Sequence, residues 1–187
     1  MNRPVPGLGG KSVRRRGFTL VEILSVVFIL SIISAIVIPQ IGRRGDLQAA
    51  AAARALVGDL TYAQNRAIAN GGWTYVTFST ANQNYTLYSG TASAPSSTPL
   101  THPVNEDSYV MTFGGAGPNA LSGVTLASVN IGSSASTLVF DSTGVPYAYA
   151  AGLPPVELST AATAVISSDN YSVTVTIEPA TGDITAQ

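Results

Sequence analysis

Residues 14–40 read RRRGFTLVEILSVVFILSIISAIVIPQ. Three arginines precede an apolar run from Phe18 to Ile38, which is about as long as the ~20 residues that cross a bilayer as a helix. Arginines directly before a span favour a cytoplasmic position for that end of the chain, so the polypeptide after the span is expected on the far side. This stretch predicts a single-pass membrane anchor that carries a domain behind it.

An ordinary secretory signal fits this stretch poorly. Such a signal has a shorter apolar region, of roughly 7–15 residues, and ends at a cleavage site of small residues. Here the apolar run is longer, and Pro39-Gln40-Ile41-Gly42 follows it.

Glu22 is unexpected in a plain anchor, because an ionisable group inside an apolar span is costly and normally has a partner. Cleavage between Gly17 and Phe18 would make Glu22 the fifth residue of the mature chain. The new α-amino group, with an ordinary pKa of about 7.7–8.0, would then supply a cation at a matching depth in a neighbouring subunit. We interpret Glu22 as the acid of such a pair.

The segment RGFTLVEIL, residues 16–24, resembles the processing site of type IV pilins and type II secretion pseudopilins. The resemblance implies that a prepilin peptidase, which is also an N-methyltransferase, cuts after Gly17 and methylates Phe18. It also implies that Glu22 directs assembly with other pilin or pseudopilin subunits. Pro39 falls where this family has a proline, and it marks the expected helix kink because proline removes a backbone donor.

A second helical pattern follows Pro39. An apolar stripe with helical spacing runs through Leu56, Leu60, Ala63 and Ala67, and Asn70-Gly71-Gly72 is a stop signal. The polar side of this helix is expected to hold most of the side chains of Arg54, Asp59, Gln64 and Arg66.

The remainder of the chain, residues 71–187, reads as β structure. Residues 73–79 and 85–88 predict a hairpin. Further strands are predicted at residues 109–113, 124–131, 137–140, 145–150, 164–167, 171–177 and 182–185, and loops at 90–105 and 114–119.

The expected fold class is therefore α+β. A long amino-terminal transmembrane helix, kinked near Pro39, leads into a head made of an antiparallel β-sheet, as in pilins. The expected divisions are a cleaved leader at 1–17, a transmembrane and assembly helix at 18–38, its amphipathic continuation at 39–70 and a periplasmic head at 71–187.

Residues 53–72 are also similar to the GspH/FimT branch of minor pseudopilins and minor pilins, and residues 140–144 and 179–184 match its turns loosely. The resemblance implies a GspH-like minor pseudopilin, whose pseudopilus supports the export of folded proteins by a type II secretion system. It places the chain in the bacterial inner membrane, with a cytoplasmic leader and a periplasmic head.

Two alternatives remain open from the sequence. One is a FimT-like minor type IV pilin in pilus assembly, adhesion or DNA uptake; the other is a single-pass membrane protein with an unrelated β domain. DNA binding is disfavoured, because residues 71–187 contain seven acidic residues and no lysine or arginine. No nucleic-acid partner is expected.

The sequence predicts a structural subunit and no enzyme, cofactor or metal site. The chain has no cysteine, and its one histidine, His102, lies in a loop rich in serine, threonine and proline, where a solvated position is expected. Asp141 and Asp183 lie beside glycines and are expected to cap turns. The closely spaced carboxylates of a calcium loop do not occur.

Overall fold

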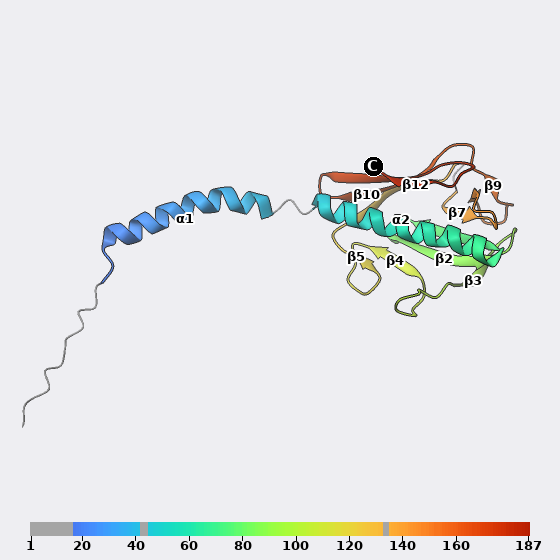
Figure 1. The fold of residues 1–187 in the computed structure, drawn as a ribbon, viewed down its shortest axis with the longest axis horizontal. Helices are drawn as coiled ribbons and strands as arrows, with labels where there is room; N and C mark the ends of the chain where they lie inside the picture. Colours follow the sequence, from blue (N-terminus) through green and yellow to red (C-terminus); the bar gives the residue numbers. More distant parts are fainter. Residues whose placement is uncertain (1–16, 42–44, 133–134) are drawn as a thin grey trace, which may run out of the picture. The chain divides into compact units, whose positions relative to one another are not determined.

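In the computed structural model, which describes residues 17–41, 45–132 and 135–187, the chain divides into two units, residues 1–42 and 43–187. The first unit contains helix α1 (Leu20–Ile41), and the second contains helix α2 (Gly45–Asn70) and the strands (Figure 1). Residues 1–16 of the expected leader lie outside the described residues.

Helix α1 forms where the apolar run predicts a helix. Its side chains from Leu20 to Ala35 are exposed within this unit, on every side of the helix. Pro39 lies inside α1, two residues before its end. Among the described residues, no helix reaches the combined length and hydropathy of a membrane span.

Helix α2 confirms the predicted stripe. Leu56, Leu60, Ala63 and Ala67 are buried, together with Ala49, Ala52 and Ala53. The helix ends in a Schellman motif, in which the N–H of Gly72 donates to the carbonyl of Ala67 at 3.0 Å and Gly71 takes a φ of 58°.

The strands form two sheets, where a single sheet was expected. In the large sheet the order is β5-β4-β2-β1-β7-β8-β9, with β3 paired to β2; in the small sheet it is β12-β11-β10-β6. All pairs are antiparallel except β4–β5. The large sheet contains β1 (Trp73–Ser79), β2 (Asn84–Gly90), β3 (Pro95–Pro99), β4 (Val110–Phe113), β5 (Ala120–Leu121), β7 (Thr137–Phe140), β8 (Pro146–Tyr149) and β9 (Val156–Glu157). The small sheet contains β6 (Thr125–Asn130), β10 (Ala162–Ser168), β11 (Tyr171–Ile177) and β12 (Ile184–Ala186).

Helix α2 joins the two sheets. It contacts β1 and β7 of the large sheet and β10, β11 and β12 of the small sheet. Figure 1 shows α2 running along the strands of the head. One hydrophobic core results, since Val76, Leu138 and Phe140 from the large sheet pack in the same cluster as Ile166 and Val175 from the small sheet. Because one face of α2 removes apolar surface of both sheets from water, α2 is the central element of the head.

Three short strands were not predicted: β3, β5 and β9. The residues of β3, PSSTP, have the composition of a loop, and they form a strand only because they pair with β2 at the edge of the sheet. The strands β5 and β9 have two residues each, too few for a periodic pattern.

Asp59 and Gln64 do not lie on the polar side of α2, and this part of the prediction is wrong. The amide of Gln64 donates to the carbonyls of Gly144 and Gly182, at 3.0 and 3.2 Å. Arg54 is exposed as predicted, and Arg66 is half-buried.

Asp59 instead faces two buried tyrosines, Tyr85 in β2 and Tyr109 directly before β4. The phenol of Tyr85 donates to Oδ2 at 2.5 Å, and that of Tyr109 donates to Oδ1 at 3.0 Å. Burial raises the pKa of Asp59 above its ordinary value of 3.8, and the two hydrogen bonds and nearby His102 lower it by less. His102 is not fully solvated, since its ring lies 4.5 Å from that of Tyr109 and is half-buried.

We expect Leu60→Ala to lower the free energy of unfolding of the head by about 2–5 kcal/mol, because Leu60 is fully buried between α2 and the sheets. Thr61→Ala, at the adjacent exposed position, is the control and should change the free energy of unfolding little. Urea unfolding of the mature chain in detergent, followed by the fluorescence of its one tryptophan, measures both. Equal effects of the two substitutions would contradict the proposed packing.

A second prediction concerns pH. Since the pKa of Asp59 is raised in the folded head, the stabilisation from its proton is complete below pH 3.8 and is lost as the pH rises through the folded pKa. The free energy of unfolding of the wild type, minus that of Asp59→Asn, should therefore decrease from about pH 4 to neutral pH. Urea unfolding of both proteins at several pH values measures this difference. The contributions of the other carboxylates are the same in both proteins and cancel. An increase over the same range would show that the tyrosine hydrogen bonds outweigh burial.

Candidate assembly site

The helix α1 begins at a threonine cap. The backbone N–H of Glu22 lies 3.3 Å from Oγ1 of Thr19 and 3.1 Å from its carbonyl oxygen, and the N–H of Ile23 donates to the same carbonyl at 3.2 Å. Thr19 with Glu22 three residues later has the sequence of a capping box. The sequence prediction had missed this role of Thr19, although the pattern is visible in the sequence.

The bond between Gly17 and Phe18 lies outside the helix. Gly17, Phe18 and Thr19 have no regular secondary structure, and 77% of the Phe18 surface is exposed. A Cβ added to Gly17 would meet no atom within 4 Å. Packing within the described residues therefore does not require a glycine at this position.

Glu22 lies in the first turn of α1, and its side chain is exposed among exposed apolar residues. It is the sole charged residue between Arg16 and Arg43. A carboxylate in this turn interacts favourably with the positive end of the helix dipole. The helix dipole thus partly offsets the charge of Glu22, and a cation beside it would complete the compensation.

The other surface of α1 suits an apolar environment. Val21, Leu24, Phe28 and Leu30 are among the large apolar side chains that are more than half exposed. The hydroxyls of Ser25 and Ser31 donate to the carbonyls of Val21 and Val27, both at 2.7 Å, so these polar groups are satisfied within the helix. A helix that is apolar on all sides is one that lipid or other helices cover.

The head offers a capped turn where the sequence predicts one. Oδ1 of Asp141 accepts hydrogen bonds from the N–H and the hydroxyl of Thr143, both at 2.8 Å, and from the N–H of Val145 at 2.9 Å. Burial raises the pKa of Asp141, but these hydrogen bonds outweigh it, and the pKa is lowered overall. In the second turn, the hydroxyl of Thr181 accepts from the N–H of Asp183 at 3.4 Å, so Thr181 provides the cap there.

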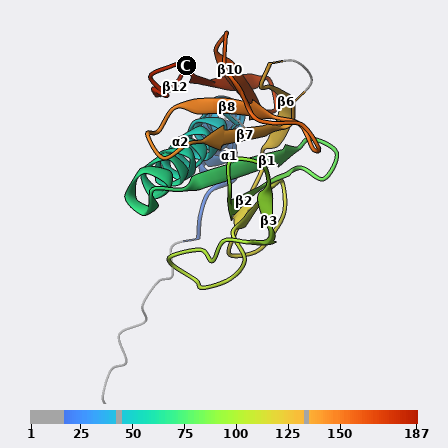
Figure 2. The ribbon, with the colours of Figure 1, turned by 90° about the vertical axis from the view of Figure 1, so that its right-hand side faces the viewer.

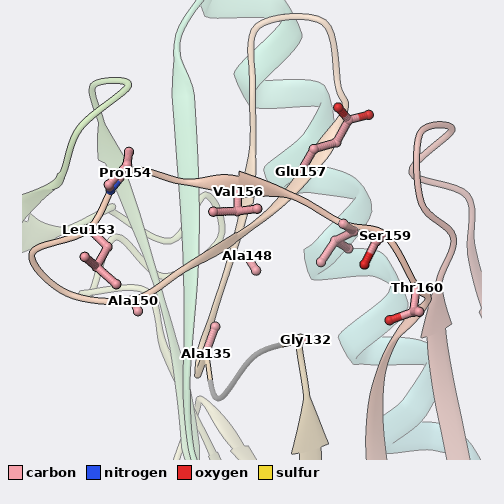
Figure 3. A pocket seen from close by; sticks show the side chains of 11 residues that line it. Gly132, Ala135, Ala148, Ala150, Leu153, Pro154, Val156, Glu157, Ser159 and Thr160 are labelled. Atoms are coloured by element: carbon pink, nitrogen blue, oxygen red, sulfur yellow. The ribbon is translucent and has the colours of Figure 1, made fainter.

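A cavity of about 140 Å³ lies beside β8 and β9. Small and apolar side chains surround it, among them Ala148, Leu153 and Val156, and Figure 3 shows the carboxylate of Glu157 pointing away from them. Among the residues that line this cavity, none forms an acid–base pair. In the described part of the chain, no group of three or more His, Cys, Asp or Glu residues is placed to hold a metal ion.

Comparisons with known proteins agree with both parts of the chain. The model of the prokaryotic N-terminal methylation motif matches residues 13–38, and that of the type II transport protein GspH matches residues 52–181. No protein with a curated description matches the chain.

Among solved structures, the minor pseudopilin EpsH from the type 2 secretion system of Vibrio cholerae has a similar fold. The TM-score is 0.51 and the sequence identity is 17%, over 75% of this chain and 96% of EpsH. The expected pilin-like head is thus confirmed as a fold. The GspH family model matches more than half of the residues of this chain. The chain therefore belongs to the GspH family of type II transport proteins.

Proposed function

We propose that the mature chain is a minor pseudopilin that assembles, with other pseudopilins, into the pseudopilus of a type II secretion system and so supports the export of folded proteins. The observation that carries this proposal is the presence in one chain of a methylation motif at 13–38 and a GspH head at 52–181. In this proposal the chain acts through its contacts with other subunits.

Processing is the first step of this function. A prepilin peptidase cuts between Gly17 and Phe18 and methylates the amino group of Phe18. The exposure of Phe18 and the absence of helix before Leu20 support this step, because a peptidase needs an extended and accessible bond. The peptidase thereby creates the cation that Glu22 lacks.

Anchoring and assembly use the same helix. Before assembly, α1 spans the inner membrane once, with the head on the periplasmic side. In the filament, neighbouring helices replace the lipid, and the amino group of one subunit pairs with Glu22 of another. Head-to-tail contacts of this kind extend into a helical polymer rather than a closed ring. Pro39 removes a backbone donor near the end of α1 and is the proposed kink.

Mass spectrometry of the protein from cells with an active prepilin peptidase tests processing. We expect a chain that begins at Phe18 and carries one additional methyl group. Gly17→Ala should accumulate as the uncut precursor, because the Cβ enters the peptidase site, whereas Gly10→Ala in the same leader should be cut normally. A wild-type chain that begins at Met1 or Asn2 would contradict the proposal.

Glu22→Ala tests assembly. We expect normal membrane insertion and at least a roughly tenfold loss of the subunit from sheared or cross-linked pseudopili, because removing one partner of a buried ion pair costs about 3–5 kcal/mol. Glu22→Gln, which keeps the shape and removes the charge, should fail in the same way. Ser25→Ala, one turn further along α1, is the control. Normal incorporation of Glu22→Gln would show that charge pairing is not the role of this residue.

A further inference from the structure

The large sheet has a second face, turned away from α2. Residues alternate between faces along a strand, and Val76, Leu138 and Phe140 belong to the core beneath α2. Their neighbours therefore lie on the opposite face, which we call the outer aromatic face. Figure 2 shows its strands β8, β7, β1 and β2 following one another. The face consists of Trp73, Tyr75, Tyr88, Val139, Tyr147 and Tyr149.

The strand register places these residues in one row. Tyr75 of β1 pairs with Tyr88 of β2 and with Val139 of β7, and Val139 pairs with Tyr147 of β8. Tyr147 in turn pairs with Glu157 of β9. The carboxylate of Glu157 thus extends the aromatic row at the edge of the sheet, on the side away from the cavity in Figure 3.

The buried residues of this face are fixed, while the rings of Trp73, Tyr88 and Tyr147 are partly accessible. Tyr75 is fully buried, and its phenol donates to the carbonyl of Thr91 at 2.6 Å. Its ring meets that of Tyr149 edge-on at 5.2 Å. Trp73 and Tyr147, with ring centroids 5.3 Å apart, are half-buried. Rings held in this way offer a surface that needs no rearrangement before a ligand binds.

Two carboxylates, those of Asp141 and Glu157, lie near the ring of Tyr147. Burial raises the pKa of Tyr147, and the charges of Asp141 and Glu157 raise it further. Asp141 remains ionised, since the hydrogen bonds of its turn lower its pKa. No lysine or arginine follows Arg66 in the sequence, so none of the strands carries a cation. Arg66 of α2 lines a cavity together with Trp73, whereas Asp141 and Glu157 place the ring of Tyr147 in a negative potential.

We propose that the outer aromatic face binds a basic segment of a partner protein, with an arginine or lysine side chain on the rings of Trp73 and Tyr147, between Asp141 and Glu157. The faces of indole and phenol rings attract cations, and the two carboxylates add charge complementarity. The acidic excess of residues 71–187 attracts a basic partner from a distance and repels nucleic acid. This role goes beyond assembly through α1, since it uses neither Gly17 nor Glu22.

The single tryptophan makes the test direct, because Trp73 lies on the proposed site. The full mature chain in detergent micelles is titrated with a short peptide in which arginines alternate with glycine and serine. We expect a saturable change in Trp73 fluorescence whose affinity falls with added salt. A peptide with citrulline in place of arginine has the same shape without the charge and should bind at least about fivefold more weakly.

Three variants locate the site. Glu157→Gln and Tyr147→Leu should each weaken binding of the arginine peptide by about two- to fivefold. Glu178→Gln changes the net charge by the same amount as Glu157→Gln, but it lies after β11 in the small sheet, and it should leave binding unchanged. Unfolding transitions measured for each variant confirm that the head is intact.

Three results would overturn the inference. Glu157→Gln and Glu178→Gln could weaken binding of the arginine peptide equally, which would indicate diffuse attraction to an acidic head. The citrulline peptide could bind as tightly as the arginine peptide, or Trp73 fluorescence could respond to a neutral oligosaccharide and not to the arginine peptide. Mass spectrometry of the same sample reports processing separately. Failure of this site and failure of the proposed pseudopilin role are therefore distinguishable.

Discussion

The packing of α2 against two sheets is the constraint on which the head depends. One face of the helix, made largely of alanine and leucine, contacts strands of both sheets, and neither sheet shares a hydrogen-bonded strand with the other. Without α2 the inner faces of the two sheets would lose the surface that covers them. Gln64 strengthens this junction, because its amide holds the turns at Gly144 and Gly182, one from each half of the head.

Local patterns predicted much of this fold. The stripe through Leu56 and Leu60 places α2, and the alternating residues of 73–79 place β1, because each pattern is set by an element's own periodicity. The strands β7 and β11 occur at the predicted residues. The division into two sheets was not predictable in this way, since it depends on which strands pair across long stretches of chain.

The same distinction applies to single residues. Gly17, Phe18 and Glu22 were identified because the processing segment is continuous in sequence, and the roles assigned to them stay predictions. Asp59 was misplaced because an acid is expected on the solvent side of a helix, although Asp59 lies three residues after Leu56 and four before Ala63, beside the buried stripe. Its partners Tyr85, in β2, and Tyr109, directly before β4, come from far along the chain. The outer aromatic face could not be predicted from the sequence for a similar reason, because Trp73, Tyr88 and Tyr147 become neighbours only through strand register.

The position of the Thr19 cap has a consequence for the precursor. The hydrogen bonds that start α1 come from the hydroxyl and the carbonyl of Thr19, and the bond between Gly17 and Phe18 lies before them. Cutting that bond therefore changes no hydrogen bond of the helix. The proposed cut requires no refolding of α1. The proposed maturation would remove the five basic side chains of residues 1–17 and leave one α-amino group at Phe18, so it would change the charge before α1 and leave the hydrogen bonds that start the helix in place.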